Sequence, residues 1–165
     1  MITFKKITWE NLDQCLKLEV AENQKTFVGS NEYSLAQAYV ALEEGKLTVM
    51  PFAVYAGDTM IGFIMMTYSE KHEFGGGPSY TIARLMLDKQ FQSRGYGMLA
   101  THEAIDYIRT FPKGEASTIY LSYEADNKVA RALYTSCGFV ETGEIDEDGE
   151  LVAVLNLKGA ELTSK

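Results

Sequence analysis

The spacing of apolar and polar residues predicts one strand and two helices in the first 45 positions. Residues Ile2–Ile7 alternate as in a short edge strand. Thr8 is placed to cap a helix over Trp9–Glu22, and Ser34 precedes a second helical run that closes at Gly45. The segment between the two helices is expected to be a loop. The residues expected to face the core are Leu12, Cys15, Leu16 and Leu18 in the first helix and Leu35, Ala38, Tyr39 and Leu42 in the second.

The rest of the pattern predicts a sheet with two further helices. Gly57 and Asp58 lie between two β-rich runs and predict an antiparallel hairpin. Strand Tyr80–Leu87, a helix over Met98–Phe111 and strand Thr118–Tyr123 make a βαβ unit, which normally implies parallel pairing. The other expected elements are strands over Met50–Ala56, Met60–Tyr68, Phe139–Ile145 and Leu151–Leu157 and a helix over Lys128–Cys137.

This order of elements predicts one α/β (α+β) domain. Its sheet is expected to be mixed and mostly antiparallel, with about seven strands flanked by about four helices. A chain of 165 residues suits a single core, which we assign to residues 1–158, with a tail over residues 159–165.

Charge and hydropathy narrow the range of partners. A formal net charge of −8 disfavours binding to nucleic acid and to anionic membranes, and it is compatible with a small cationic substrate. No run of about 18 apolar residues is present to span a bilayer, and the first residues lack the apolar core of a signal peptide. A cytoplasmic protein is therefore expected.

Cysteine and histidine residues give no sign of redox or metal chemistry. Cys15 and Cys137 do not form a Cys-x-x-Cys pair, so we expect two core thiols. His72 lies in a loop, and His102 lacks a spaced partner that would make a metal site. No metal is assigned.

A glycine-rich segment, Gln92-Ser93-Arg94-Gly95-Tyr96-Gly97, connects the strand of the βαβ unit to its helix. Glycines at the start of a helix let backbone N–H groups converge, and the positive end of the helix dipole adds to the attraction for an anion. The segment therefore predicts a phosphate cradle. A plain turn that needs positive φ would show the same glycines.

Dinucleotide binding is a second alternative for this segment. Residues Gly95–Ala100 match the pattern G-x-G-x-x-G/A, and Glu115 follows at about the spacing of a ribose-binding acid. In that fold, however, the first glycine comes directly after the first strand, whereas residues Asp88–Arg94 intervene here. Glu115 also precedes the next strand instead of ending it, so the match is superficial.

A second motif follows the βαβ unit. Asn127 is placed to begin a helix, and Tyr134 lies seven residues later, on nearly the same helical face. Gly138 and Phe139 follow. Taken alone, Asn127 could be an N-cap and Tyr134 a core tyrosine.

Together the two motifs resemble the signatures of the GNAT superfamily of N-acetyltransferases. Family members carry Q/R-x-x-G-x-G/A, matched by Gln92, Gly95 and Gly97, and commonly N-x-x-A-x-x-x-Y-x-x-x-G-F, matched from Asn127 to Phe139. The resemblance extends over nearly the whole chain and implies acetyl-CoA as co-substrate. The residues that it implies for acetyl-CoA binding are Leu85, Met86, Leu87, Gln92, Ser93, Arg94, Gly95, Tyr96, Gly97, Met98, Asn127 and Tyr134.

The resemblance also implies roles within that set. Backbone amides from Arg94 to Met98 would take the pyrophosphate, and strand residues Leu85–Leu87 would hydrogen-bond the pantetheine arm. Tyr134 would be the general acid that protonates the departing thiolate. Glu22 and Glu124 are the candidates for a general base.

The acceptor is expected to be a small cationic amine. The resemblance implies that the acidic segment Glu141–Glu150 borders the acceptor pocket, and we assign its Glu144 and Asp146 to substrate binding together with Glu22 and Glu124. A charged, solvated turn would show the same residues. Short segments resemble the bacterial spermine/spermidine acetyltransferase branch, so a polyamine is the favoured acceptor. The alternatives are a protein N-terminus, an amino acid, an aminoglycoside, or a CoA-binding protein without turnover. The family resemblance makes a homodimer a further expectation.

Overall fold

The computed structural model describes residues 1–158 and contains one seven-stranded sheet with the strand order β1-β2-β3-β4-β5-β7-β6. The pairings are antiparallel except between β4 and β5, so the expected mixed α/β fold is confirmed. The expected tail over residues 159–165 lies outside the described residues. The elements are β1 (Ile2–Lys6), α1 (Leu12–Lys17), the 3₁₀ turn η1 (Glu22–Gln24), α2 (Asn31–Glu44), β2 (Thr48–Ala56), β3 (Thr59–Ser69), β4 (Ser79–Leu87), α3 (Tyr96–Arg109), β5 (Thr118–Tyr123), α4 (Lys128–Ser136), β6 (Val140–Ile145) and β7 (Leu151–Asn156).

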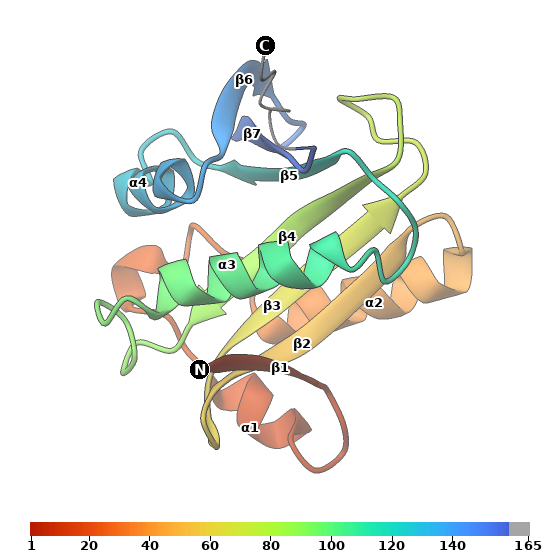
Figure 1. The fold of residues 1–165 in the computed structure, drawn as a ribbon. Coiled ribbons are helices and arrows are strands. Elements are labelled where there is room, and N and C mark those ends of the chain that lie inside the picture. The colour runs from red at the N-terminus through yellow and green to blue at the C-terminus, as the bar shows by residue number, and fades with distance from the viewer. Residues whose placement is uncertain (159–165) are drawn as a thin grey trace.

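Helices cover both faces of the sheet. Helix α3 lies in front of the sheet in Figure 1, and α1 and α2 lie behind it. Each face has its own apolar core, because successive strand residues point to opposite faces. The core beneath α3 and α4 includes Ile61, Ile64, Tyr80, Ile108 and Phe139. The core beneath α1 and α2 includes Cys15, Ala53, Phe63, Met65 and Met86.

The parallel contact between β4 and β5 is short. Only Ser79, Tyr80 and Thr81 of β4 pair with β5, although β4 continues to Leu87 and β5 to Tyr123. The two strands therefore separate beyond Thr81. We call the space between their separated ends the wedge.

A β-bulge lies at the point where the wedge opens. Met66 pairs with Ile82 and Met65 with Arg84, so Ala83 is an extra residue in β4. Because of this insertion, Ile82 and Leu85 both face the α3 side. Arg84 instead reaches α2 on the opposite side, where its Nη2 donates to Gln37 Oε1 at 3.3 Å.

Helix α1 is shorter than the helix expected over Trp9–Glu22. It begins late because the Asn11 side chain accepts from Thr8 N–H at 2.8 Å and donates to the carbonyl of Lys6 at 3.0 Å, closing a turn after β1. It ends early because Asn31 Nδ2 donates to the carbonyl of Cys15 and Glu19 N–H donates to Asp88. Tertiary contacts thus replace the last turns of the expected helix.

Helices α2 and α3 both start before the expected positions. The N-cap of α2 is Ser30, whose hydroxyl accepts from Tyr33 N–H, and Ser34 is buried inside the helix. Leu35 and Ala38 pack against the core as expected, on the same side as buried Ser34, whereas Tyr39 and Leu42 are 65% and 75% exposed instead of facing the core. Helix α3 begins at Tyr96, two residues before Met98.

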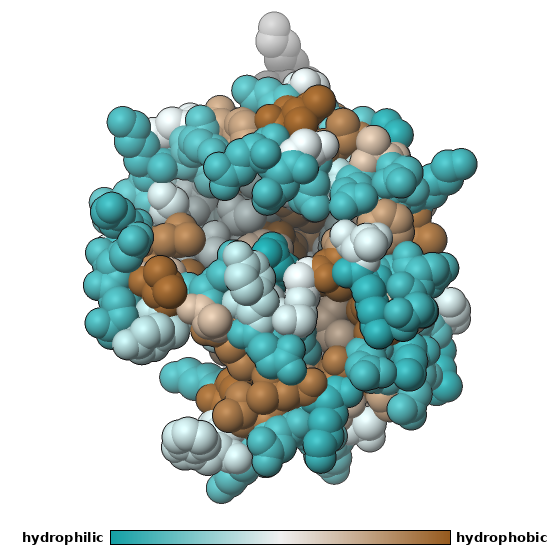
Figure 2. Space-filling view, turned by 180° about the vertical axis from the view of Figure 1, so that it is seen from behind, coloured by the Kyte–Doolittle hydropathy of each residue, from teal (hydrophilic) through white to brown (hydrophobic). Residues whose placement is uncertain are grey.

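The surface behind the sheet is mostly hydrophilic, with small separate apolar groups and a hollow near the centre of the view (Figure 2). Within residues 1–158, no helix has both the length and the apolar character needed to cross a bilayer.

The model makes a specific prediction about Gly62, which pairs with Leu87 where β3 meets the end of β4. A Cβ at Gly62 would overlap the carbonyl oxygen of Met86 and lie 2.9 Å from the Leu87 side chain. Gly62→Ala is therefore expected to lower the free energy of unfolding by roughly 1–3 kcal/mol, as overpacked sites do. Chemical denaturation measures this change. Gly77→Ala is the control, since no atom lies within 4 Å of its added Cβ, and equal stability of the two variants would contradict the packing.

Candidate active site

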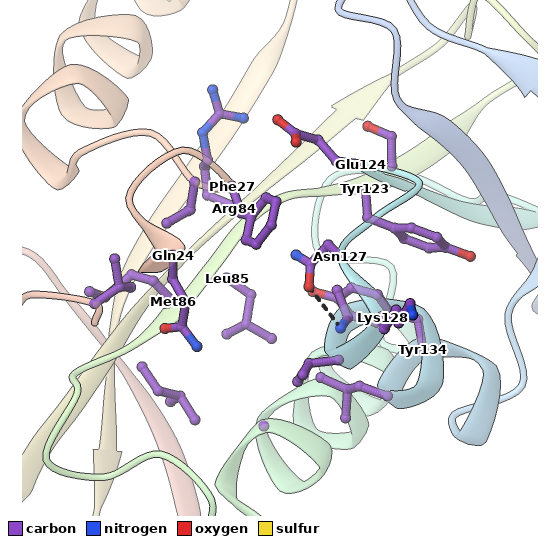
Figure 3. A pocket seen from close by; sticks show the side chains of 18 of the residues that line it. Gln24, Phe27, Arg84, Leu85, Met86, Tyr123, Glu124, Asn127, Lys128 and Tyr134 are labelled. Atoms are coloured by element: carbon purple, nitrogen blue, oxygen red, sulfur yellow. Dashed lines mark hydrogen bonds between the residues drawn. The ribbon is translucent and has the colours of Figure 1, made fainter. Parts of the chain in front are cut away.

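A cavity of about 870 Å³ occupies the wedge and connects the two faces of the sheet. Its walls come from β4, the end of β5, the start of α3, helix α4 and the connection between α1 and α2. Figure 3 shows Arg84, Leu85 and Met86 of β4 on one side and Tyr123, Asn127 and Tyr134 on the other. The single cavity therefore brings together both sequence motifs.

The glycine-rich segment forms the floor of the cavity where α3 begins. Ser93 and Gly95 both have left-handed backbone, with φ of 61° and 81°. This conformation disfavours a residue with a Cβ such as Ser93, and strained backbone of this kind clusters at ligand sites. The first four N–H groups of a helix have no intrahelical acceptor, so the amides at the start of α3 are available to an anion.

Gly97 permits close packing at the same place. A Cβ there would lie 3.3 Å from Leu133 Cδ2 on α4. Its missing side chain thus keeps the start of α3 accessible and lets α4 approach. Seven of the residues expected to bind acetyl-CoA through β4 or this segment line the cavity: Leu85, Met86, Leu87, Gln92, Ser93, Gly95 and Gly97. Met98 lines it too, whereas Arg94 and Tyr96 do not.

The Gln92 side chain holds the cradle against two neighbouring segments. Its Nε2 donates to the carbonyl of Leu87 at 3.0 Å and to Gln24 Oε1 at 2.8 Å. Asp88, which is buried, accepts from the backbone N–H groups of Glu19 and Gln90. These bonds fix the path of the chain from β4 to α3.

The end of β4 offers unpaired backbone groups to the wedge. Asp88 N–H donates to the carbonyl of Ile61 on β3 at 2.8 Å. Because hydrogen-bonding groups of successive residues point to opposite sides of a strand, Met86 also faces β3, and Leu85 and Leu87 face the wedge. Gln92 already uses the carbonyl of Leu87. The N–H and C=O of Leu85 and the N–H of Leu87 remain available to an extended ligand.

Helix α4 supplies Asn127 and Tyr134 to the cavity. Asn127 is the N-cap, since its Oδ1 accepts from Ala130 N–H at 3.2 Å, and its amide also lines the cavity (Figure 3). Half-buried Tyr134 stacks against Tyr123 with ring centroids 6.0 Å apart and meets Phe139 edge-on. Burial raises the pKa of Tyr134 above its ordinary value. The hydroxyl therefore keeps its proton at neutral pH, as a general acid must.

An ion-pair cluster positions the tyrosine pair. Glu141 of β6 accepts from Tyr123 Oη at 2.9 Å and pairs with Arg131 of α4 through both of its oxygens. Burial, followed by the bond to Glu141, raises the pKa of Tyr123 to about 12. Glu141, in the acidic segment of the sequence, thus links β5, α4 and β6.

The four acids that the sequence assigned to the acceptor lie in different places. Glu124 lines the cavity. Glu22 lies outside the cavity lining, where it is exposed and paired with Lys25 at 2.7 Å, and it belongs to η1 instead of ending the first helix. Glu144 is exposed on β6 and also outside the lining. Asp146 lies beside a smaller cavity of about 60 Å³ with His72 and Phe74.

Several residues of the cavity wall are not among those assigned from the sequence. Asp148 and Glu150 line it from the turn that begins β7, and Lys128 lines it from α4. Arg84 lines it from β4, and the Arg84 Nε has no hydrogen-bond partner among residues 1–158. Asp148 and Glu150 belong to the acidic segment Glu141–Glu150, but nothing in the sequence of that segment distinguishes Glu150 from Glu147. Nothing in the local pattern distinguishes Arg84.

No group of three or more histidine, cysteine or acidic residues that could hold a metal occurs among the described residues. His72 stacks on Tyr120 with 4.2 Å between ring centroids, and its Nε2 lies 3.1 Å from Thr81 Oγ1. Burial lowers the pKa of His72.

The chain also matches a known protein family. The family model described as "Acetyltransferase (GNAT) family" matches residues 12–139. The chain belongs to this family. It is an acetyl-CoA-dependent N-acetyltransferase, and the dinucleotide alternative is excluded.

Relatives of this GNAT chain act on several kinds of amine. A probable spermine N(1)-acetyltransferase of Bacillus subtilis subsp. natto is 30% identical over 159 residues, covering 94% of this chain and 99% of the relative. A spermidine N-acetyltransferase of Vibrio cholerae, solved with CoA and spermine, has a TM-score of 0.66 and 19% identity over 94% of this chain and 95% of its own. An aminoglycoside acetyltransferase solved with coenzyme A has a TM-score of 0.74 and 16% identity over the same shares. The two solved structures support the fold alone.

The cradle of this GNAT protein predicts the effect of a substitution at Gly97. A valine there would crowd both the helix N-terminus and Leu133, so Gly97→Val is expected to weaken acetyl-CoA binding about tenfold or more. Calorimetric titration measures the affinity, and circular dichroism checks the fold. Gly77→Val, in open space on the β3–β4 connection, is the control. If Gly97→Val binds acetyl-CoA with unchanged affinity, the pyrophosphate does not bind at the start of α3.

Proposed function

We propose that this N-acetyltransferase acetylates a primary amine of a polyamine such as spermine or spermidine. The observation that carries the proposal is the charge of the cavity wall beside the wedge. Four carboxylates line it, two near the end of β5 and two before β7: Glu124, Asp126, Asp148 and Glu150. A flexible polycation is attracted to such a wall, and each carboxylate contributes modestly. The relative at 30% identity supports the same acceptor.

In the proposed reaction the amine attacks the thioester directly, without an acyl-enzyme. The start of α3 holds the pyrophosphate, and Leu85 and Leu87 hold the pantetheine arm by backbone hydrogen bonds. This arrangement carries the thioester through the wedge toward the acceptor side. Tyr134 then donates its phenolic proton to the departing sulfur, which makes the thiolate a better leaving group. A homodimer and a cytoplasmic location stay predictions.

Arg84 favours a second class of acceptor. Its guanidinium belongs to the same cavity wall as Glu124, so the wall presents a cation as well as carboxylates. Figure 3 shows Arg84 and Glu124 on opposite sides of the cavity. A molecule with both an amine and a carboxylate, such as an amino acid or a peptide N-terminus, matches this pair of charges.

Comparison of acceptors tests the proposal directly. With acetyl-CoA fixed, kcat/KM is measured for spermine, spermidine, an aminoglycoside, a free amino acid and a peptide N-terminus. Polyamines are expected to be the best acceptors, and added salt is expected to raise their KM while the KM for acetyl-CoA changes little. A preference for the amino acid or the peptide would overturn the polyamine proposal and favour the charge pair of Arg84 and Glu124.

The general-acid role predicts a specific kinetic change in Tyr134→Phe. Removing only the hydroxyl is expected to lower kcat by roughly 10²-fold, with the Kd for acetyl-CoA nearly unchanged. Steady-state kinetics and calorimetric titration measure the two quantities. Tyr107→Phe is a suitable control, since that tyrosine packs against Phe52 and does not line the cavity. An unchanged kcat where chemistry limits the rate would make Tyr134 a stacking residue only.

A further inference from the structure

Glu150 is a carboxylate of the cavity wall that is held by its neighbours. It is half-buried immediately before β7, and it accepts a hydrogen bond from Ser122 Oγ on β5 at 2.9 Å. The turn that carries it is tightly closed, because Asp146 Oδ1 accepts from the backbone N–H groups of Asp148 and Glu150. Its carboxylate is thus held in one place by Ser122 and by the closed turn.

The alternation of β5 separates Glu150 from Tyr134. Tyr123 belongs to the core beneath α3 and α4, where it stacks against Tyr134. Ser122 precedes Tyr123 on the same strand and therefore points to the opposite face. Glu150, bonded to Ser122, lies on that face, the side of the sheet that α1 and α2 cover. The cavity passes between the two.

The charges around Glu150 come from four parts of the chain. The ionisable cavity-wall or neighbouring groups are Asp146 and Asp148 in its own turn, Glu124 and Asp126 after β5, Lys128 at the start of α4 and Arg84 on β4. Burial raises the pKa of Glu150, the Ser122 bond opposes the rise, and repulsion from Asp146, Asp148 and Glu124 adds to it. A carboxylate whose pKa is raised binds a proton more strongly than an exposed carboxylate does, so it is a better acceptor for the proton of an ammonium group.

We propose that Glu150 is the general base of this enzyme, receiving the proton that the acceptor ammonium must lose before it attacks. The inference rests on the proposed acetylation of a primary amine. It replaces Glu22, which lies outside the cavity wall, and it assigns to Glu124 only a share in attracting the cation.

The proton balance of the reaction closes with Glu150 and Tyr134 on opposite faces. R–NH₃⁺ gives one proton to the Glu150 carboxylate, and the nitrogen lone pair forms the C–N bond. The C–S bond breaks with its electron pair on sulfur, which takes the phenolic proton of Tyr134. The proton that the new amide nitrogen sheds restores the phenol, and Glu150 releases its proton to solvent. One H⁺ is produced for each acetyl group transferred.

Glu150→Gln tests the role, because it keeps the shape of the side chain and removes its basicity. Near pH 7 it is expected to lower kcat for the best amine by about 10²-fold, the usual scale of general-base catalysis. The loss should shrink as the pH approaches the pKa of a primary amine, about 10, because the neutral amine needs no base. Glu147→Gln, exposed in the same hairpin and outside the cavity wall, is the charge-matched control and should behave as wild type.

Ser122→Ala gives an independent readout on a folded enzyme. The Ser122 hydroxyl stabilises the ionised form of Glu150, so its removal raises the pKa of Glu150 further. In Ser122→Ala the acidic limb of the plot of kcat/KM against pH is expected to move to higher pH. In Glu150→Gln this limb should be absent.

Two outcomes would overturn the role of Glu150, and neither depends on which amine is the preferred acceptor. A loss in Glu150→Gln that appears only in the amine KM and does not shrink at high pH would reduce Glu150 to a substrate anchor and overturn the proposal. Equal kinetics and pH profiles for Glu150→Gln and Glu147→Gln would also overturn it. If the preferred acceptor is another primary amine, the polyamine proposal fails and the same variants test Glu150 with that amine.

Discussion

The early end of the pairing between β4 and β5 is the constraint on which the rest of this site depends. Three residues of β4 pair with β5, and the bulge at Ala83 lies two residues after the last of them, Thr81. Past this point the backbone of Leu85 and Leu87 faces a space that no strand fills. An edge with free N–H and C=O groups is a ready partner for an extended ligand. The same separation opens a passage through the sheet, which a continuous ladder would close.

The passage divides the chemistry between two faces. The anion cradle and Tyr134 belong to the side that α3 and α4 cover, with Tyr134 held by its stacking on Tyr123 and by the Glu141 ion pairs behind it. The carboxylates of Glu124 and Glu150 line the same cavity, and Glu150 lies on the face that α1 and α2 cover. Acetyl-CoA and the acceptor amine can therefore approach from opposite faces of the sheet. In the proposed reaction Glu150 takes a proton from the amine on one face, and Tyr134 gives a proton to the sulfur on the other.

The sequence predicted the elements whose cause is local. The strands, the αL end of α2 at Gly45 and the glycine-rich start of α3 follow from periodicity and backbone preference. The C-terminal end of α1 could not be predicted, since it depends on Asn31 and Asp88, which approach it only in the fold. The position of Glu150 in the site could not be predicted for the same reason. Its role follows from Ser122, 28 residues earlier, and the acidic hairpin as a whole gives no reason to separate it from Glu147.

Amide hydrogen exchange with and without CoA is the most direct test of the wedge as the cofactor site. The account predicts that binding slows exchange at Leu85 and Leu87 on the free edge of β4 and at residues Gly95–Met98 at the start of α3. Amides of β4 that already pair with β3, such as Met86, should change much less. Unchanged exchange at both the free edge and the helix start in CoA-saturated protein would contradict the account.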